Sequence, residues 1–278
     1  MNYEQMKIFA MCCMVFDHVV RIFPLERMLA PLADALWLAG RGGLADWLLD
    51  GFPLYLMYIG RLAAPIFIYC LVQGFAHTSD VRRYLGRILL AAAVAQAPYI
   101  AFDLAESRLF GIEGDWRDVS LNILSTLALA LCVLAVHEEL GRRGLAFLSP
   151  LAVAAATWLA MELDMEGGQG YIILAWAYHI ARDRPRLQKA LLYIPAVLLA
   201  RRGLVLWAVR SLGTPEQVMV LRNCLLNVLG NYFGMLIALL DDGEKGEAGK
   251  GFQYACYAFY PAHFAVLAAA GFLRPPFL

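Results

Sequence analysis

Three ionisable residues lie inside the first hydrophobic run of the chain, where a charged side chain is expensive. Asp17 and His18 are adjacent, and Arg21 follows within one helical turn. A centrally placed Asp or Arg costs roughly 2.5–3.5 kcal/mol on membrane-insertion scales. Such groups usually face a bundle interior or a water-filled cavity and mark chemistry or transport. A His–Asp pair can act as a general base, with the carboxylate orienting the imidazole.

Further polar side chains recur inside or at the ends of later apolar runs. They are Arg61, His77, Gln96, Asn122, Tyr260 and His263. Arg61 needs an anionic partner or backbone carbonyls, and both a structural pair with Asp17 and a site for a phosphate or carboxylate fit. The basic group Arg82, Arg83 and Arg87 fits the excess of Lys and Arg that is typical of cytoplasmic loops. It fits equally the phosphates of a nucleotide-like donor, because guanidinium groups bind phosphate bidentately.

The remaining candidates also have two interpretations each. Gln96 and Asn122 are of the type that hydrogen-bonds between membrane helices, or they contact a substrate. Tyr260 and His263 flank Pro261, which removes a backbone hydrogen bond and kinks a helix. A kink beside a histidine fits a site, and a lone membrane histidine also fits a structural role.

No metal centre is predicted. The six cysteines lie in apolar runs, and none has zinc-ligand spacing with a nearby histidine. His137 and His179 stand at the ends of runs beside charges, and we interpret them as interface residues. No Walker loop, HExxH or GxSxG arrangement is present. The chemistry would come from His, Asp, Arg, Tyr and Asn, and it suits deprotonation of an amine or hydroxyl that attacks a thioester.

The elements that must position these residues are membrane helices. The chain of 278 residues is 61% hydrophobic and 17% charged, against about 45–50% and about 25% in soluble domains. Formal net charge is +0, so there is no polybasic signal for nucleic acid. The lipid bilayer is the expected environment. The first run lacks a small-residue cleavage site after it and is interpreted as a retained helix.

A span needs about 20 mostly apolar residues, and this predicts an all-α, polytopic transmembrane bundle of about nine spans (8–10). We treat residues 1–278 as a single domain. The candidate runs are 5–23, 53–75, 84–103, 119–137, 145–163, 169–181, 189–211, 217–240 and 252–273. The semi-polar stretch 28–51, with Trp37 and Trp47, is either a membrane-surface hairpin or one more short span. Arg201 and Arg202 inside the seventh run have no explanation from the sequence.

Loop charge predicts the orientation. Lys and Arg follow the second, fourth, sixth and eighth runs, and the alternate loops, including 162–166, are acidic or mixed. The positive-inside rule then places the N-terminus in the cytoplasm. With an odd number of spans, the C-terminus lies outside.

The order of these pieces resembles the TraX family of bacterial inner-membrane proteins. The matching stretches are Phe16–His18, Ile59–Phe67, Gly74 with His77–Thr78, Tyr84–Arg87, Gln96–Tyr99, Asn122 and Phe259–His263. Each piece alone is unspecific, whereas the ordered series is fairly specific. One departure precedes the sixth run, where the family tends to show an Asp-Tyr-Gly type motif and this chain has Asp164–Gly170.

The resemblance implies an integral membrane acetyltransferase. The family's namesake is linked to N-terminal acetylation of conjugative pilin, relatives are described as fimbrial assembly proteins, and the family resembles membrane acyltransferases that acetylate sugars. By resemblance, the chain would sit in the bacterial inner membrane and take an acetyl group from cytoplasmic acetyl-CoA. The acceptor would be the N-terminal amine of a pilin or, alternatively, a surface polymer acetylated on oxygen or nitrogen.

The resemblance also implies roles for the polar residues. The catalytic candidates are His18, Asp17 and His263; the donor-binding candidates are Arg61, His77, Arg82, Arg83 and Arg87; the acceptor-binding candidates are Asn122, Tyr260 and Gln96. Two other classes stay open. One is a small-anion transporter that uses Arg61 and His18, although the inverted repeats typical of transporters are not detected. The other is a non-catalytic pilus assembly factor.

Overall fold

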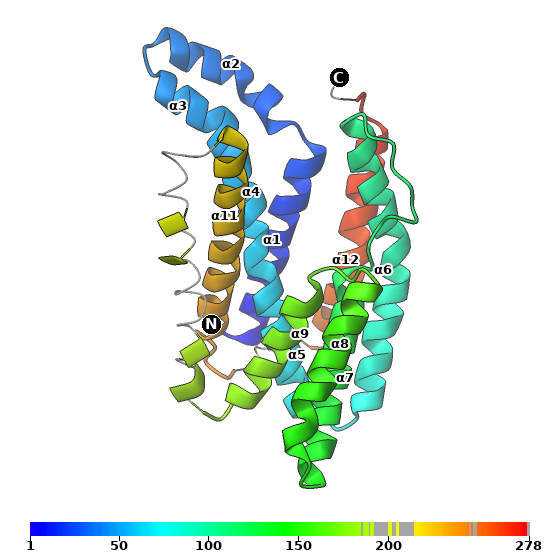
Figure 1. The fold of residues 1–278 in the computed structure, drawn as a ribbon. Helices are drawn as coiled ribbons and strands as arrows, with labels where there is room; N and C mark the ends of the chain where they lie inside the picture. Colours follow the sequence, from blue (N-terminus) through cyan, green and yellow to red (C-terminus); the bar gives the residue numbers. More distant parts are fainter. Residues whose placement is uncertain are drawn as a thin grey trace.

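A computed structural model of the chain describes residues 1–184, 186–188, 190, 191, 200, 201, 204, 205, 214–244, 246 and 249–276. The part described is a bundle of helices (Figure 1), which confirms the all-helical prediction. The predicted seventh run, 189–211, falls almost entirely outside the described residues, and so do Lys189, Arg202 and Lys245.

Five described helical segments are long and apolar enough to cross a membrane. They are Gly42–His77, Val81–Leu109, Ile123–Arg142, Gln217–Ala238 and Gly251–Phe272. A sixth arises if α1 (Tyr3–Ile22) and α2 (Leu25–Leu38), which meet at 81°, form one broken span. The predicted fifth and sixth spans are α8 (Ser149–Glu162) and α9 (Gly168–Ala181), of 14 residues each. At 1.5 Å per residue they reach about 21 Å, short of a bilayer core of about 30 Å.

The helices define two ends of the bundle. The chain begins at the end where α5 (Ala63–His77) passes to α6 (Val81–Leu109), where α7 (Ile123–Arg142) passes to α8, and where α11 (Pro215–Ala238) ends (Figure 1). We call this the basic end, because the arginines that follow the second and fourth runs belong to these turns or flank them. The sequence groups the same loops on one side of the membrane. The membrane side itself stays a prediction.

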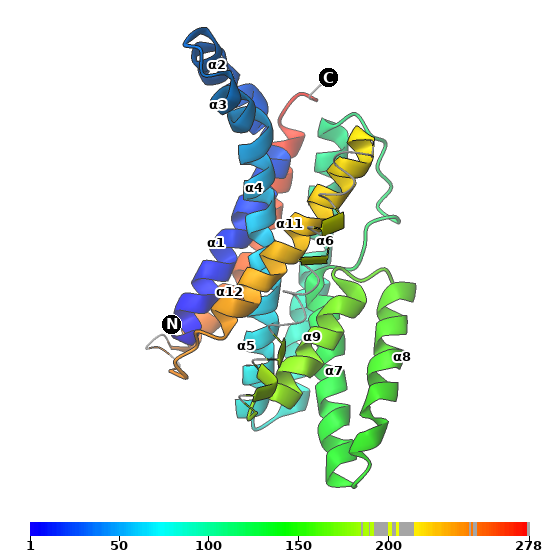
Figure 2. The same ribbon diagram turned by 60° about the vertical axis from the view of Figure 1, so that its left-hand side comes forward.

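Buried apolar residues form three clusters that tie the helices together. The first joins α1 to α5, and the second joins α1, α6 and α12 (Lys250–Phe272). The third joins α5, α6, α7, α8, α9 and α11. α6 and α12 run side by side in the same direction (Figures 1 and 2). The second cluster matters most for function, because it brings the far half of α1 against α12.

The long segment from Gly42 to His77 changes geometry in its middle. α4 (Phe52–Ile59) gives way to a 3-10 turn, η2 (Gly60–Leu62), before α5 continues. Two helices press closely on this turn. A Cβ on Gly60 would lie 2.8 Å from Asp17 Oδ2 on α1, and a Cβ on Gly234 of α11 would lie 2.5 Å from the Leu62 carbonyl oxygen. Gly230 and Gly234 have the small-xxx-small spacing that lets membrane helices approach closely.

Two connections meet halfway along the bundle. α7 begins there, and the turn between α8 and α9 lies beside its start (Figures 1 and 2). The Leu121 N–H donates to the Asp164 carbonyl at 2.9 Å, and the Glu166 N–H donates to the Leu121 carbonyl at 2.8 Å. The sequence places the acidic loop 162–166 at an outer end of the bundle. That is wrong, because α8 and α9 are too short to carry it there.

The stretch 28–51 contains a helical hairpin, and its place at the membrane surface stays a prediction. α2 packs against α3 (Gly42–Asp46), with Ala33 and Ala45 buried, and a π-helical turn, η1 (Trp47–Gly51), leads on to α4. The hairpin stands beyond the rest of the bundle at the end opposite the basic end (Figure 1). Its tip exposes Trp37 and Leu38.

Candidate functional site

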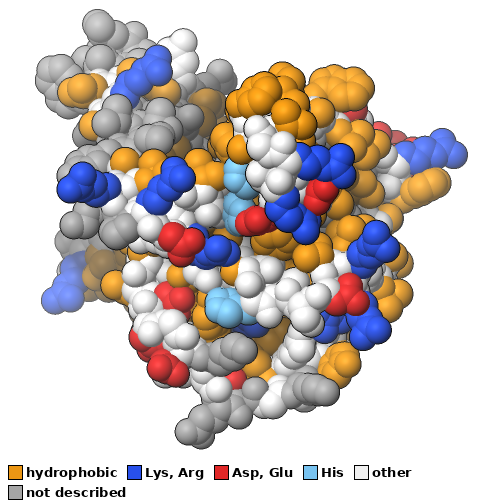
Figure 3. Space-filling model, turned by 90° about the horizontal axis from the view of Figure 1, so that it is seen from below, with side chains coloured by type: hydrophobic (Ala, Val, Ile, Leu, Met, Phe, Trp, Pro, Cys, Tyr) orange, Lys and Arg blue, Asp and Glu red, His pale blue; other side chains and the backbone are white. Residues whose placement is uncertain are grey.

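A cavity of about 720 Å³ extends from the basic end to the middle of the bundle. Near the basic end its lining includes Lys7, Gln73, His77, Thr78, Arg87 and Gln253. At its inner end the lining includes Asp17, His18, Arg61, Glu166, Tyr171 and Tyr260. The cavity therefore joins a charged entrance to a polar centre halfway along the helices. Figure 3 looks onto the basic end and shows Lys and Arg side chains around this face, with histidine side chains toward its middle.

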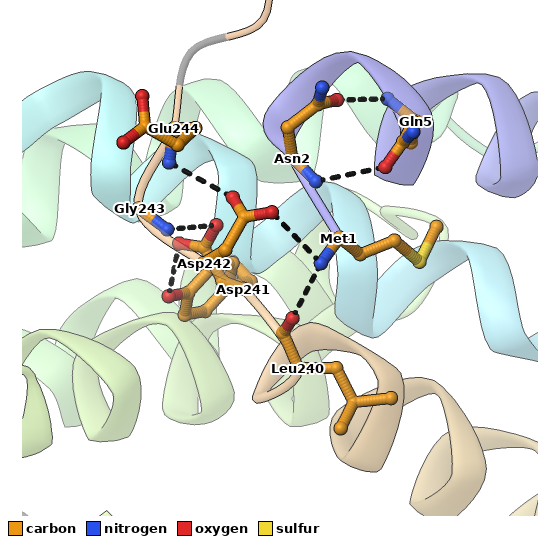
Figure 4. Close-up of polar contacts among 9 residues, drawn as sticks. Met1, Asn2, Gln5, Leu240, Asp241, Asp242, Gly243 and Glu244 are labelled. Carbon is orange, nitrogen blue, oxygen red and sulfur yellow. Dashed lines mark hydrogen bonds and ion pairs between the residues drawn. The ribbon is translucent and has the colours of Figure 1, made fainter.

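The start of the chain and the segment after α11 hold each other at the entrance (Figure 4). The Met1 ammonium donates to the Leu240 carbonyl at 3.0 Å and pairs with Asp242 at 3.1 Å. The Glu244 N–H donates to Asp242 Oδ1, also at 3.0 Å. This backbone donor and then the ammonium hold the pKa of Asp242 below its usual value. Gly243, in the same turn, lines the cavity.

The predicted donor-binding residues separate into three places. His77 and Arg87 line the cavity near the basic end, and the His77 Nδ1 donates to the Gln73 carbonyl at 2.8 Å. Arg82 and Arg83 do not line the cavity. Arg83 pairs with Asp80 at 3.0 Å, and the Arg83 side chain is 87% exposed. Arg61 belongs to the inner end instead.

At the inner end, two histidines from opposite ends of the sequence are in direct contact. His18 Nδ1 on α1 lies 3.0 Å from His263 Nε2 on α12. The second ring nitrogen of His263, Nδ1, lies 3.1 Å from the carbonyl oxygen of Phe259, one turn earlier. Phe102 and Phe264 pack against the His18 ring, with ring centroids 5.3 and 4.6 Å away. Packing and hydrogen bonds therefore fix both rings.

This geometry sets the tautomers of the pair. The Phe259 carbonyl only accepts, so the His263 Nδ1 carries the proton and its Nε2 accepts. The N–H between the rings is then that of His18 Nδ1, and the His18 Nε2 keeps a free lone pair. His18 lines the cavity and His263 lies behind it. His18 is thus placed to touch a substrate, and His263 to orient His18.

Asp17 serves a different partner. Its Oδ1 accepts from Arg21 Nε at 3.1 Å, and the Arg21 guanidinium also lies 3.6 Å from Glu106 on α6. An ion pair between Asp17 and Arg61, one of the two interpretations of Arg61 from the sequence, is absent from the described residues. Adjacent residues on a helix point about 100° apart, so Asp17 cannot face the same partner as His18. It packs on Gly60 and lines the cavity from there.

Gln96 and Asn122 form a network of their own. The Asn122 amide donates to the Gln96 side-chain oxygen at 2.7 Å and to the Ala92 carbonyl at 2.9 Å, and the Gln96 amide donates to the Ser120 carbonyl at 3.0 Å. Asn122 is fully buried, and neither residue lines the cavity. Their contacts fix the start of α7 against the middle of α6.

Glu166 is not among the residues that the sequence predicts for the site, yet it lines the inner end of the cavity. Its Oε2 accepts from the Ile123 N–H at 3.1 Å at the start of α7, where helix N–H groups lack partners. Thr126 donates to the Glu166 carbonyl at 2.7 Å. The turn that carries Glu166 is unusual, because Asp164 and Gly167 both have positive φ, at 44° and 75°. In the sequence, the difference from the family's Asp-Tyr-Gly type motif draws attention to the segment Asp164–Gly170. Only the fold shows that Glu166 of this segment lines the cavity.

Two tyrosines complete the inner end. Tyr171 of α9 packs its ring over Gly167, which has no side chain to obstruct it. Tyr260, a predicted acceptor-binding residue, has a buried hydroxyl with no hydrogen-bond partner among the described residues. Buried hydroxyls normally find a partner, so Tyr260 is free to bind a ligand that enters the cavity.

The other two histidines belong to a separate cluster near the basic end. His137 is hydrogen-bonded to Ser149 at 2.8 Å, and His179 pairs with Glu138 at 3.2 Å. These contacts join α7 to α8 and α9, and neither histidine lines the cavity. Nowhere in the described part of the chain do three or more His, Cys, Asp or Glu side chains form a group that could hold a metal ion.

Comparison with known proteins adds to this geometry. The model of the TraX protein family matches residues 2–270. The chain belongs to the TraX family. A relative from Dichelobacter nodosus, named probable fimbrial assembly protein FimC of serogroup H1, is 30% identical over 272 residues, 96% of this chain and 94% of the relative. No solved structure matches the chain. This TraX-family protein is a multi-pass membrane protein.

Proposed function

We propose that this protein is an acetyl-CoA-dependent acetyltransferase of the bacterial inner membrane. The observation that carries the proposal is the cavity that runs from the basic end to the free Nε2 of His18. The basic end faces the cytoplasm, in accord with the positive-inside rule. His77 and Arg87 hold the phosphates of the donor near the entrance, and the thioester reaches His18.

In the proposed reaction, His18 Nε2 takes a proton from the acceptor as the acceptor attacks the thioester carbonyl. A bond forms between the acceptor and the acetyl carbon, the carbon–sulfur bond breaks, and the CoA thiolate leaves. The thiolate then takes the proton from the His18 imidazolium, which restores the neutral ring. General-base catalysis of this kind contributes typically 10²–10⁴-fold. His263 contributes by keeping the His18 lone pair directed into the cavity.

The proposed acceptor is the N-terminal amine of a pilin, because the relative from Dichelobacter nodosus is named for fimbrial assembly. A surface glycan is the alternative acceptor. Small-anion transport is less well supported, because the lining of the cavity, as far as it is described, includes no residue of 24–50 or 104–118 at the opposite end. A cavity whose described lining ends near the middle of the bundle suits group transfer better than passage.

The test is transfer of radiolabelled acetyl from acetyl-CoA by the purified full-length protein in lipid nanodiscs. A pilin peptide with a free N-terminus serves as acceptor, and the same peptide with a blocked N-terminus is the control. We expect label on the free peptide alone. Label on neither peptide, with binding of acetyl-CoA intact, would favour the non-catalytic assembly factor.

A further inference from the structure

Arg61 lies too deep in the cavity to serve the phosphates of the donor. It lines the inner end together with His18 and Glu166, whereas His77 and Arg87 line the end near the entrance. Carrying several phosphate charges to the middle of a membrane bundle is costly. An anion bound by Arg61 must therefore be small, carry a single charge and lie close to the reacting atoms.

The backbone of Arg61 is fixed, and one donor of its side chain is unused. It lies on η2, where a Cβ on Gly230 of α11 would come within 2.6 Å of the Arg61 Cβ. A 3-10 stretch inside a long helix often marks a functional hinge. The Arg61 Nε is buried and has no hydrogen-bond partner in the part of the chain that the structure describes. A buried N–H without a partner is costly, so this donor points to a ligand.

Two neighbours orient the guanidinium without occupying that donor. The charge of Arg61 interacts with the Glu166 carboxylate and with the Tyr171 hydroxyl. No nitrogen of Arg61 lies within 4.0 Å of a carboxylate among the described residues, because Asp17 is paired with Arg21 and Glu166 Oε2 accepts from Ile123. The positive charge is thus balanced at a distance, and the Nε remains available.

We propose that Arg61 binds the oxyanion that forms when the acceptor attacks the acetyl thioester beside His18, and that Glu166 positions the Arg61 guanidinium. This rests on the proposed function. As the new bond to the acetyl carbon forms, the carbonyl π pair moves to oxygen, and Arg61 donates to that oxygen. When the carbonyl re-forms, the carbon–sulfur bond breaks, and the thiolate takes the proton from His18. Arg61 is a catalytic residue in this scheme, and Glu166 is a positioning residue.

The test compares Arg61→Ala with Arg87→Gln in nanodiscs, with kcat for transfer and the Kd of CoA by calorimetry as separate readouts. Alanine keeps the Cβ that packs on Gly230. We expect Arg61→Ala to lower kcat about 10²–10³-fold, as removal of one oxyanion donor does, with the Kd of CoA unchanged. Arg87→Gln should raise that Kd. A raised Kd with unchanged kcat in Arg61→Ala would overturn the proposal.

A second readout does not depend on transfer. Acetate is a small oxyanion, and its binding in the presence of CoA can be followed by NMR. We expect acetate to bind the wild type and Arg87→Gln and to fail with Arg61→Ala. If the wild type transfers no acetyl yet this pattern holds, only the proposed function fails. Equal binding of acetate to all three proteins would overturn the role of Arg61.

Glu166→Gln tests the positioning role, because glutamine keeps the shape and the contact with the Ile123 N–H. We expect kcat to fall about tenfold with the Kd of CoA unchanged. In the Arg61→Ala background the same change should have no further effect, since residues that act as a unit are non-additive. A full additional loss in the double variant would show that Glu166 does not act through Arg61.

Discussion

His18 Nδ1 donates to His263 Nε2 across 3.0 Å, and His263 Nδ1 donates in turn to the Phe259 carbonyl. This relay does for His18 what a carboxylate does in a Ser-His-Asp triad, because it selects the tautomer and the ring orientation. The pair differs from the triad in charge. His263 is neutral, so it does not stabilise an imidazolium at His18 as a carboxylate would. The contact joins α1 to α12, so the site is complete only when the first and last helices have packed.

The first prediction separates the two histidines. His18→Ala should lower acetyl transfer by roughly 10²–10⁴-fold, because it removes the proposed general base. His263→Ala should cost less, because His18 keeps its Nε2 and loses only its orientation. Both variants should bind CoA as the wild type does. The measurement is single-turnover transfer alongside calorimetry.

The roles of the two histidines would be reversed if His263→Ala were inactive while His18→Ala kept wild-type turnover. Full activity in both variants would contradict the acyltransferase mechanism and strengthen the interpretation as an anion transporter. Complete loss in His18→Ala, together with an acetylated His18 trapped in the wild type, would indicate covalent carriage of the acetyl group on the ring.

The second prediction uses two arginines that are four residues apart. Arg87 lines the cavity, whereas Arg83 is exposed and paired with Asp80. A hydrogen bond to a charged group contributes about 1.5–3 kcal/mol, so Arg87→Gln should weaken CoA binding about tenfold or more. Arg83→Gln should leave the Kd within about twofold. Equal effects of the two changes would mean that the donor lies outside the cavity.

The third prediction concerns the close packing at η2. Gly234→Ala would set a Cβ 2.5 Å from the Leu62 carbonyl oxygen, and backbone cannot move away cheaply. We expect a loss of about 1–3 kcal/mol in stability, the usual cost of overpacking. Gly86→Ala in α6 is the control, because a Cβ added there would have no described atom of another segment within 4 Å. It should be neutral or stabilising by roughly 0.5–1 kcal/mol. The measurement is thermal unfolding in detergent. An equal loss of stability in both variants would contradict this account.

The fourth prediction concerns pH at the entrance. The pKa of Asp242 is lowered by its contacts in the folded state, so the stabilisation is present above the ordinary carboxyl pKa and is lost as pH falls through the lowered value. Asp242→Asn should therefore reduce the loss of thermal stability between about pH 5 and pH 3. Glu244→Gln is the control, because Glu244 contributes its backbone N–H and not its carboxylate. An unchanged pH profile in Asp242→Asn would show that this contact does not persist in solution.

Part of this site follows from the sequence and part does not. Asp17, His18, Arg61 and His263 stand out because an ionisable residue in an apolar run is expensive and therefore needs a reason. Their partners cannot be identified from the sequence. Asp17 pairs with Arg21 on its own helix, whereas His18 pairs with His263, 245 positions away. Glu166 escapes notice because its loop looks solvent-exposed in the sequence. The short reach of α8 and α9 is what brings that loop to the middle of the bundle.

The fifth prediction concerns orientation. Single cysteines introduced into a cysteine-free protein at position 2, in 138–144 and at Arg184 should react with a membrane-impermeant reagent only from the cytoplasmic side, because these positions flank the Lys- and Arg-rich loops. Asp115→Cys, in the acidic segment that follows α6, should react only from the opposite side. A cysteine at Met165 should react poorly from the outer face, because its turn lies halfway along the bundle beside Leu121. Labelling of position 184 from outside alone would invert the topology, and CoA could then not reach the entrance from the cytoplasm.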